Sequence, residues 1–230
     1  MRFNTICTLF ALTLAGVSSA CLADEEHPNS VRVGLYYVTY HSSADDISGP
    51  FVPPGLNVEV ENTTTLYLAY VRRLSSHFDL ELAAGWPPLT KTKGKGPAMV
   101  GSVPYNGEVI SSARWFAPTL LLNYSFVDES HAWRPYIGVG INYTHFYDRV
   151  STPAGDAASG GPTSIKLPDS FGPAATLGLA YHPTSRWSVN LSYSVSKVSS
   201  NLTATTAGLE RHSHVDFGPR AAVLSGGYSF

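Results

Sequence analysis

The stretch Trp187-Ser188-Val189-Asn190-Leu191-Ser192-Tyr193-Ser194-Val195 alternates between apolar and polar side chains at every position. Successive side chains of a β-strand point to opposite faces, so all the apolar residues of this stretch fall on one face. The opposite face carries only Ser and Asn and no charged residue. A strand with one apolar face and one small, neutral, polar face is typical of a barrel that contacts lipid on its outside.

The same period of two recurs along the chain and predicts an all-β fold. The predicted strands cover residues 31–42, 57–74, 78–88, 108–127, 134–150, 169–182, 187–203 and 213–230. The connections after the second, fourth and sixth strands are short, whereas those after the first, third, fifth and seventh are long and rich in Gly, Pro, Ser and Thr. This asymmetry predicts an eight-stranded antiparallel transmembrane β-barrel with short periplasmic turns, longer extracellular loops and both termini on the periplasmic side.

A soluble β-sandwich or lipocalin-like barrel also alternates with period two, but its outer face is rich in Lys and Glu. Charged residues make up only 14% of this chain, against roughly 25% in soluble domains. The formal net charge of −2 also argues against nucleic acid as a partner, because phosphate binding needs a basic surface. The chain ends at Phe230 on an alternating strand, which resembles the signal read by the outer-membrane assembly machinery.

The N-terminus is predicted to be a cleaved signal peptide covering residues 1–23, which leaves 24–230 as a single barrel domain. Arg2 supplies the positive charge, residues 6–17 the short apolar run, and 18–23 the small residues of a cleavage site. Cleavage after Ala23 removes both cysteines of the chain. A second reading stays open, in which Cys21 is the acylated first residue, although Ser18 stands where lipidation signals favour Leu.

Charged residues near the second hairpin indicate how the lower lumen is filled. Arg73, Asp79 and Glu81 are odd-numbered and share the lumen face if the turn is Ser75-Ser76-His77, because a one-residue slip would reverse every side chain. Arg73 is then expected opposite Asp79, with Glu81 one step further up, as a charged plug; ordinary structural pairing predicts the same contact. The remaining predicted lumen-lining residues are Thr65, Tyr67, Tyr136, Asn142 and Thr144.

Prolines within three predicted strands indicate where the wall is weak. Pro118, Pro173 and Pro219 each stand near the expected top of the ~25 Å apolar band. Proline cannot donate a ladder hydrogen bond and is normally confined to sheet edges and bulges. We expect at least one of them to mark a lateral opening through which a substrate leaves into the bilayer. Bulges that end regular pairing at the rim are the alternative.

Several segments resemble the OmpW family of small outer-membrane proteins, which also includes relatives associated with alkane import. The resemblance covers most of the chain after residue 56 and is carried by 62–66, 81–84, 118–120, 134–144, 169–172 and 227–230. Residues 43–56 do not match the pattern. The resemblance implies a barrel in the outer membrane of a Gram-negative bacterium, with a narrow, partly hydrophobic channel for uptake of small hydrophobic molecules.

Three functions follow: a channel for small hydrophobic molecules, a structural or adhesive barrel with a closed lumen, and a lipid-modifying enzyme. The enzyme is disfavoured because His145, between Tyr143 and Tyr147 on the lipid face, has no serine nucleophile evident beside it. No cofactor and no metal are expected, since His212 and His214 lack a completing ligand set. Expected partners are outer-membrane lipids, the assembly machinery at Phe230 and a small hydrophobic substrate. The basic loop with Lys91, Lys93 and Lys95 is expected either to contact lipopolysaccharide or to be an ordinary solvated loop. A monomer is expected, with an oligomer left open.

Overall fold

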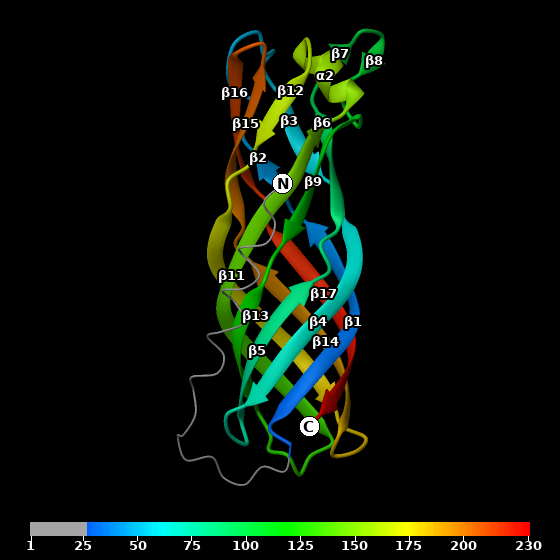
Figure 1. The fold of residues 1–230 in the computed structure, drawn as a ribbon, viewed down its shortest axis with the longest axis vertical. Coiled ribbons are helices and arrows are strands. Elements are labelled where there is room, and N and C mark those ends of the chain that lie inside the picture. Colours follow the sequence, from blue (N-terminus) through cyan, green and yellow to red (C-terminus); the bar gives the residue numbers. More distant parts are fainter. Residues whose placement is uncertain (1–26) are drawn as a thin grey trace, which may run out of the picture.

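The computed structural model describes residues 27–230, and antiparallel strands form nearly all of it (Figure 1). The predicted signal peptide lies outside the described residues. The strands are β1 (Asn29–Tyr40), β2 (Ser43–Ala44), β3 (Asn57–Val60), β4 (Thr63–Arg73), β5 (Phe78–Gly85), β6 (Leu89–Lys95), β7 (Met99–Val100), β8 (Val103–Pro104), β9 (Val109–Phe116), β10 (Thr119–Ser125), β11 (Trp133–Ser151), β12 (Thr163–Lys166), β13 (Ser170–Tyr181), β14 (Trp187–Ser196), β15 (Ser199–Thr206), β16 (Leu209–Asp216) and β17 (Pro219–Ser229). Within the described residues, no helix is long and apolar enough to cross a membrane.

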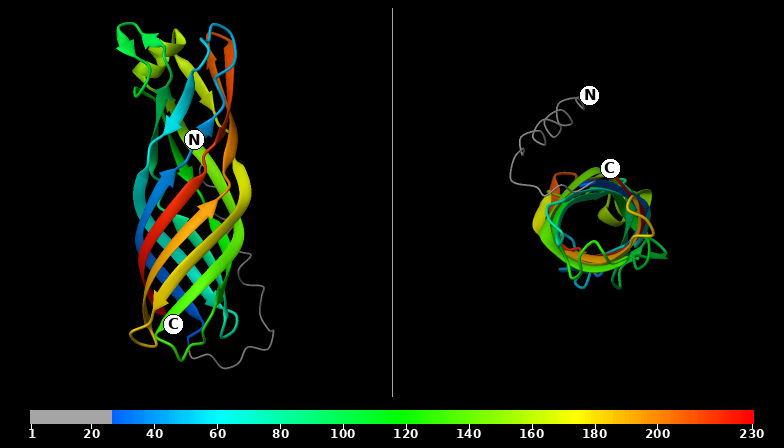
Figure 2. Two further views of the ribbon diagram at one scale, coloured as in Figure 1. Left: turned by 180° about the vertical axis from the view of Figure 1, so that it is seen from behind. Right: turned by 90° about the horizontal axis from the view of Figure 1, so that it is seen from below.

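Eight of these strands close on themselves. The order is β10-β5-β4-β1-β17-β14-β13-β11, and β11 pairs back with β10. The view along the axis shows the closed ring (Figure 2). Short turns join β4 to β5, β10 to β11 and β13 to β14 at the end where the C-terminus lies. Asn29 and Phe230 exchange backbone hydrogen bonds of 3.2 and 2.8 Å there. The predicted eight-stranded antiparallel barrel is confirmed, with all eight strands in the expected places.

The two faces of each barrel strand differ as predicted. On β14, Trp187 and Leu191 are each 58% exposed on the outside, whereas Ser188 and Asn190 are 7% and 2% exposed on the inside. The outward residues of the neighbouring strands are also large and apolar. In this class of barrel the outward apolar face contacts lipid rather than water, so its exposure does not destabilise the protein in a membrane.

Above the closed ring the strands continue as two separate sheets. One contains β3, β6, β9 and the upper part of β11; the other contains β12, β15, β16 and β2. Several residues expected in extracellular loops are therefore in strands. The seventh connection is not long, because β15 and β16 meet at a two-residue turn, Ala207-Gly208, with φ of 47° and 79°. Positive φ at both central residues matches the twist of a tight hairpin.

The fifth connection contains a helix that the sequence reading missed, α2 (Pro153–Ser159). The side chain of Thr152 accepts a hydrogen bond of 3.1 Å from the Gly155 amide, Pro153 begins the helix, and Gly160 ends it with a left-handed φ of 85°. A capping Thr, a Pro at the first position and a Gly after the last are the usual signals of helix ends. At seven residues the helix is too short to show an apolar period.

Candidate functional site

A buried cluster of charged and polar side chains lies in the lower lumen. The carboxylate of Glu81 on β5 accepts hydrogen bonds from Arg32 Nη1 at 3.0 Å, from Asn123 Nδ2 at 2.8 Å and from the Tyr67 hydroxyl. Arg32 also lies over the ring of Tyr136, 6.0 Å from its centroid. The Arg32 and Glu81 side chains are only 9% and 5% exposed. We call Arg32, Glu81, Tyr67 and Asn123 the lumen charge cluster.

The predicted hairpin contact lies just below this cluster. Arg73 stands opposite Asp79 in the ladder, with Nε 3.9 Å from Oδ1, and its Nη1 also lies 2.7 Å from Glu129. Residues 75–77 form the turn, with Leu74 paired to Phe78. Glu81, however, pairs with Arg32 rather than extending the Arg73 pair. Arg32 was missed, although it stands on the face of β1 opposite Val31 and Val33, where alternation places a lumen residue.

The five residues expected to line the lumen all fall on inward faces. Tyr67, Tyr136, Asn142 and Thr144 are 7%, 6%, 3% and 3% exposed. Thr65 is half-buried, and its hydroxyl donates to the Trp86 carbonyl at 2.6 Å. Tyr67 belongs to the lumen charge cluster and Tyr136 contacts it, whereas Asn142 and Thr144 line an apolar cavity above it.

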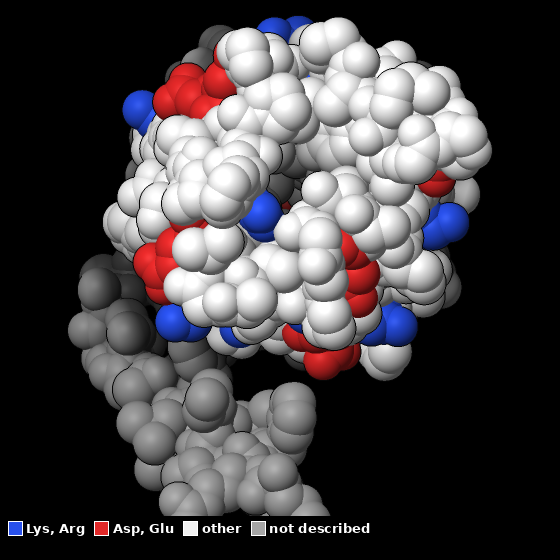
Figure 3. Space-filling view, turned by 90° about the horizontal axis from the view of Figure 1, so that it is seen from above, with Lys and Arg blue, Asp and Glu red and all other residues white. Residues whose placement is uncertain are grey.

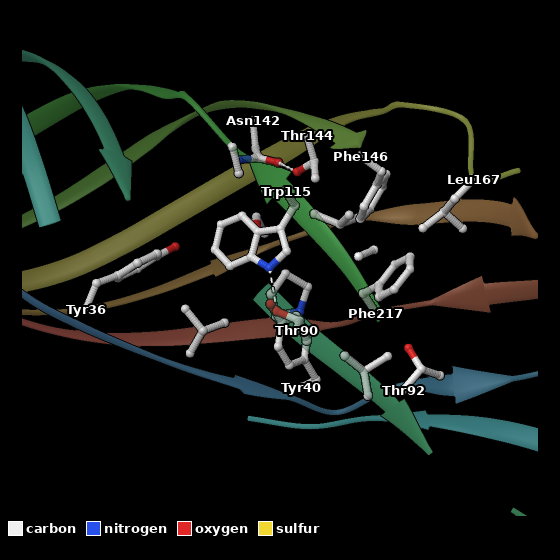
Figure 4. Close-up of a pocket in the computed structure, with 17 residues that line it drawn as sticks. Tyr36, Tyr40, Thr90, Thr92, Trp115, Asn142, Thr144, Phe146, Leu167 and Phe217 are labelled. Atoms are coloured by element: carbon white, nitrogen blue, oxygen red, sulfur yellow. Dashed lines mark hydrogen bonds between the residues drawn. The ribbon is translucent and has the colours of Figure 1, made fainter. Parts of the chain in front are cut away.

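This upper cavity contains about 600 Å³ free of protein atoms, counted to its open ends. Five of its lining side chains are aromatic: Tyr36, Tyr40, Trp115, Phe146 and Phe217. They come from four strands or their ends and converge on the lumen (Figure 4). The Trp115 indole N–H donates to the Thr90 hydroxyl at 2.9 Å, which satisfies its polar group inside an apolar space. The extracellular end has charged side chains around its rim and a narrow hollow near its centre (Figure 3).

The strand ladder beside this cavity is interrupted. β5 and β10 pair upward as far as Ala83 and Thr119, and pairing resumes between β6 and β9 at Leu89 and Arg114. Residues 84–88 and 115–118 do not pair with each other, and we call this the ladder interruption. On the outer sides the ladders continue, with Trp86 bonded to β4 and Phe116 paired to β11.

Three prolines lie in the ladder interruption: Pro87, Pro88 and Pro118. Pro118 is outside any strand, between β9 and β10, contrary to its predicted place within the fourth strand. Pro173 is paired in register with Ile141 inside β13, and Pro219 begins β17 opposite Tyr40, so neither borders a break of this kind.

Polar groups at the upper border of the interruption are partly satisfied by a side chain. Arg114 Nη1 donates to the Pro87 carbonyl at 3.2 Å, and Arg114 Nε lies 3.7 Å from Asp148. A second cavity, of about 590 Å³ when counted to its open ends, lies below the upper one. Ala84 and Gly85 line it on one side of the interruption and Ala117 on the other, and Ala117 also lines the upper cavity. Both cavities therefore touch the break in the wall.

The remaining candidates lie above or outside the lumen. Lys91, Lys93 and Lys95 are on β6 rather than in a loop, and Lys93 bonds Glu61 at 2.7 Å, which raises the pKa of Lys93. His145 contacts Asp169 at 2.8 Å. His212 lies 3.7 Å from Glu210, so a carboxylate does stand beside this histidine, contrary to the sequence reading. Within residues 27–230, however, no group of three potential ligands is placed to hold a metal.

Comparison with known proteins identifies the family. The model of the OmpW family matches residues 29–230. The chain belongs to the OmpW family. This OmpW-family barrel is 29% identical to outer membrane protein W of Vibrio cholerae, over 99% of each chain. It therefore lies in the outer membrane of a Gram-negative bacterium, embedded in lipid.

Two further relatives bear on the site. The barrel superposes on the crystal structure of the outer membrane protein OprG from Pseudomonas aeruginosa with a TM-score of 0.78 and 25% identity, covering 88% of this chain and 95% of the other. It is also 29% identical to the dibenzothiophene metabolism operon protein PahQ of Pseudomonas aeruginosa, over 63% of this chain and 64% of that protein.

Proposed function

We propose that this OmpW-family barrel takes up small hydrophobic molecules from outside the cell and releases them sideways into the outer membrane. The observation that carries the proposal is the apolar, aromatic-lined upper cavity directly beside the ladder interruption. An apolar molecule can leave this cavity in two directions, downward past the lumen charge cluster or sideways into the bilayer. Transfer to lipid keeps its surface out of water, whereas passage downward would require it to separate buried ion pairs.

The aromatic lining and the relatives support a substrate class. Aromatic rings favour offset and edge-to-face contacts with other rings, so the upper cavity suits flat aromatic molecules. PahQ is named for an operon of dibenzothiophene metabolism, and dibenzothiophene is a flat aromatic molecule of three fused rings. Outer-membrane lipids remain the surroundings of the barrel, while lipopolysaccharide contact at Lys91 and Lys95 and recognition of the final strand at Phe230 by the assembly machinery are further proposals.

Uptake into liposomes tests this function. The purified barrel is placed in vesicles, and the initial uptake rates of a series of small aromatic and aliphatic compounds are compared with those of sugars and inorganic ions. We expect faster uptake of the hydrophobic compounds than in protein-free vesicles, and no faster entry of sugars or ions. Conductance of ions without hydrophobic uptake would indicate a general pore, and neither activity would indicate the structural or adhesive barrel.

A proline variant tests the lateral route. Pro118→Val restores a backbone donor beside the ladder interruption, and we expect slower hydrophobic uptake at unchanged barrel yield. Pro173→Val is the matched control, because Pro173 lies in a paired strand away from the interruption. Equal uptake by both variants and the parent would argue against exit through this part of the wall.

A further inference from the structure

Tyr36 occupies the junction between the upper cavity, the second cavity and the ladder interruption. It lies on the lumen face of β1 and lines both cavities. In the close-up it stands at the end of the upper cavity opposite Leu167 and Phe217, next to Trp115 (Figure 4). Because Leu167 and Phe217 lie toward the extracellular sheets, Tyr36 forms the floor of the upper cavity.

The ring of Tyr36 rests on a glycine at the edge of the interruption. A Cβ added to Gly85 would lie 3.0 Å from Cδ1 and 3.3 Å from Cε1 of Tyr36. The backbone of Gly85 is not in the positive-φ region, so its conformation does not require glycine. A larger residue there would be tight, because the Tyr36 ring and Thr65 Cγ2, 3.1 Å from the added Cβ, would each have to give by a few tenths of an ångström. Gly85 is also the last residue of β5, two residues beyond Ala83, where pairing with the neighbour β10 ends.

Tyr36 is held in this position by apolar packing and by contacts with two other rings. Its centroid lies 6.5 Å from that of Trp115 in an edge-to-face arrangement and 6.1 Å from that of Tyr67 in a tilted one. Within residues 27–230, its hydroxyl makes no hydrogen bond to another group, whereas the Tyr67 hydroxyl is held by Glu81. Side-chain rotation of Tyr36 therefore breaks no hydrogen bond, and the aromatic contacts that it gives up are individually weak.

We propose that Tyr36 is the gate between the upper cavity and the second cavity, and this rests on the proposed function. With the ring on Gly85, Tyr36 stands between the two cavities. When the ring rotates away from Gly85, the two cavities join, and an apolar molecule that meets the ladder interruption only at Ala117 also reaches it at Ala84 and Gly85. The substrate itself favours the open position by replacing the ring contacts that Tyr36 gives up.

The first test measures uptake by gate variants in liposomes. Tyr36→Ala removes the ring, and we expect at least a threefold faster initial uptake of an aromatic probe such as naphthalene. Tyr36→Phe keeps the ring, so it should not reproduce the increase that Tyr36→Ala gives. Tyr37→Ala is the matched control, since Tyr37 is the next residue, faces lipid and is 46% exposed. Tyr36→Leu provides a second gate variant if the alanine variant folds poorly, as judged by heat-modifiable gel mobility.

The second test does not depend on transport. Ala174→Cys places a thiol in the second cavity, below Tyr36, and Ala113→Cys places one in the upper cavity, above it. In a background carrying Cys7→Ser and Cys21→Ser, a small membrane-impermeant methanethiosulfonate is added from the extracellular side. Tyr36→Ala should speed modification at position 174 severalfold and leave the rate at position 113 unchanged.

The outcomes separate the gate from the function. If the parent barrel takes up hydrophobic probes but neither Tyr36→Ala nor Tyr36→Leu changes uptake or labelling at position 174, Tyr36 only fills space and the gate is wrong. If labelling at position 174 responds to Tyr36→Ala but no variant takes up a hydrophobic probe, the gate stands and the proposed function is wrong.

Discussion

Neutralising Glu81 should destabilise the barrel far more than neutralising an exposed carboxylate of the same type. Glu81→Gln keeps the size of the side chain but leaves Arg32, whose side chain is 9% exposed, without the carboxylate that now lies 3.0 Å away. Breaking a buried ion pair by removing one partner costs about 3–5 kcal/mol. That range corresponds to a roughly 100- to 4,000-fold fall in the folding equilibrium constant, since each 1.4 kcal/mol is tenfold.

The assay is urea unfolding of the barrel in small vesicles, followed by tryptophan fluorescence. Glu129→Gln is the control, because the Glu129 side chain is 39% exposed in its pair with Arg73 and pairs this accessible contribute about 0–1 kcal/mol. Replacing both partners, with Arg32→Met and Glu81→Leu, should recover much of the loss, since no buried charge is then left alone. A loss for Glu81→Gln no larger than that for Glu129→Gln would contradict the assignment of a buried, mutually dependent pair.

Two further predictions concern the ends of the barrel. Burial, together with the positive charges of Arg134, Arg32 and Arg73, lowers the pKa of His182 from 6.5 to about 4. The unfolded chain therefore binds a proton at a higher pH than the folded barrel, and the free energy of unfolding should fall as the pH drops from about 6.5 to about 4. Measured by urea unfolding across this pH range, His182→Gln should show a smaller fall than the parent. An equal fall in both proteins would contradict this prediction. At the extracellular end, Ala207 has a φ of 47° in the turn between β15 and β16, a conformation that costs a non-glycine residue about 1–2 kcal/mol and that Asn tolerates better. Ala207→Asn should therefore increase the protection of the β15 and β16 amides against hydrogen exchange. Ala44→Asn is the control, because Ala44 of β2 lies in the same sheet and has no positive φ. Equal protection in the parent and both variants would contradict the claim that the backbone at Ala207 is strained.

The sequence predicts the barrel well because lipid makes alternation compulsory. Outward positions on a transmembrane strand are predominantly apolar, so the phase of Trp187, Leu191 and their equivalents gives the strand and its two faces. The same logic placed Arg73 beside Asp79. The upper sheets were harder, since polar and apolar residues on both faces are allowed once the strands leave the membrane.

The site was less predictable because it depends on which side chains from different strands meet, whereas the alternation describes only one strand at a time. Alternation assigns Tyr36, Trp115 and Phe146 to inward faces, but it does not say that they meet one another at the same height. The ladder interruption depends on the register between two strands, which prolines indicate only approximately. Of three equivalent prolines, Pro118 lies at the interruption and Pro173 does not, and nothing local in the sequence separates them.

The ladder interruption also bears on how deep the barrel sits in its membrane. Backbone amides and carbonyls without a ladder partner cannot be left in hydrocarbon, where each costs several kcal/mol. Three of the residues in 84–88 and 115–118 are prolines, which have no backbone N–H donor, and Arg114 donates a hydrogen bond to the Pro87 carbonyl. The other backbone amides and carbonyls without a ladder partner need hydrogen bonds to water or lipid headgroups. The break is therefore stable only at the level of the headgroups. In a bilayer a few ångströms thicker, the ladder interruption would lie in the hydrocarbon region. The stability of this barrel should therefore depend on membrane thickness.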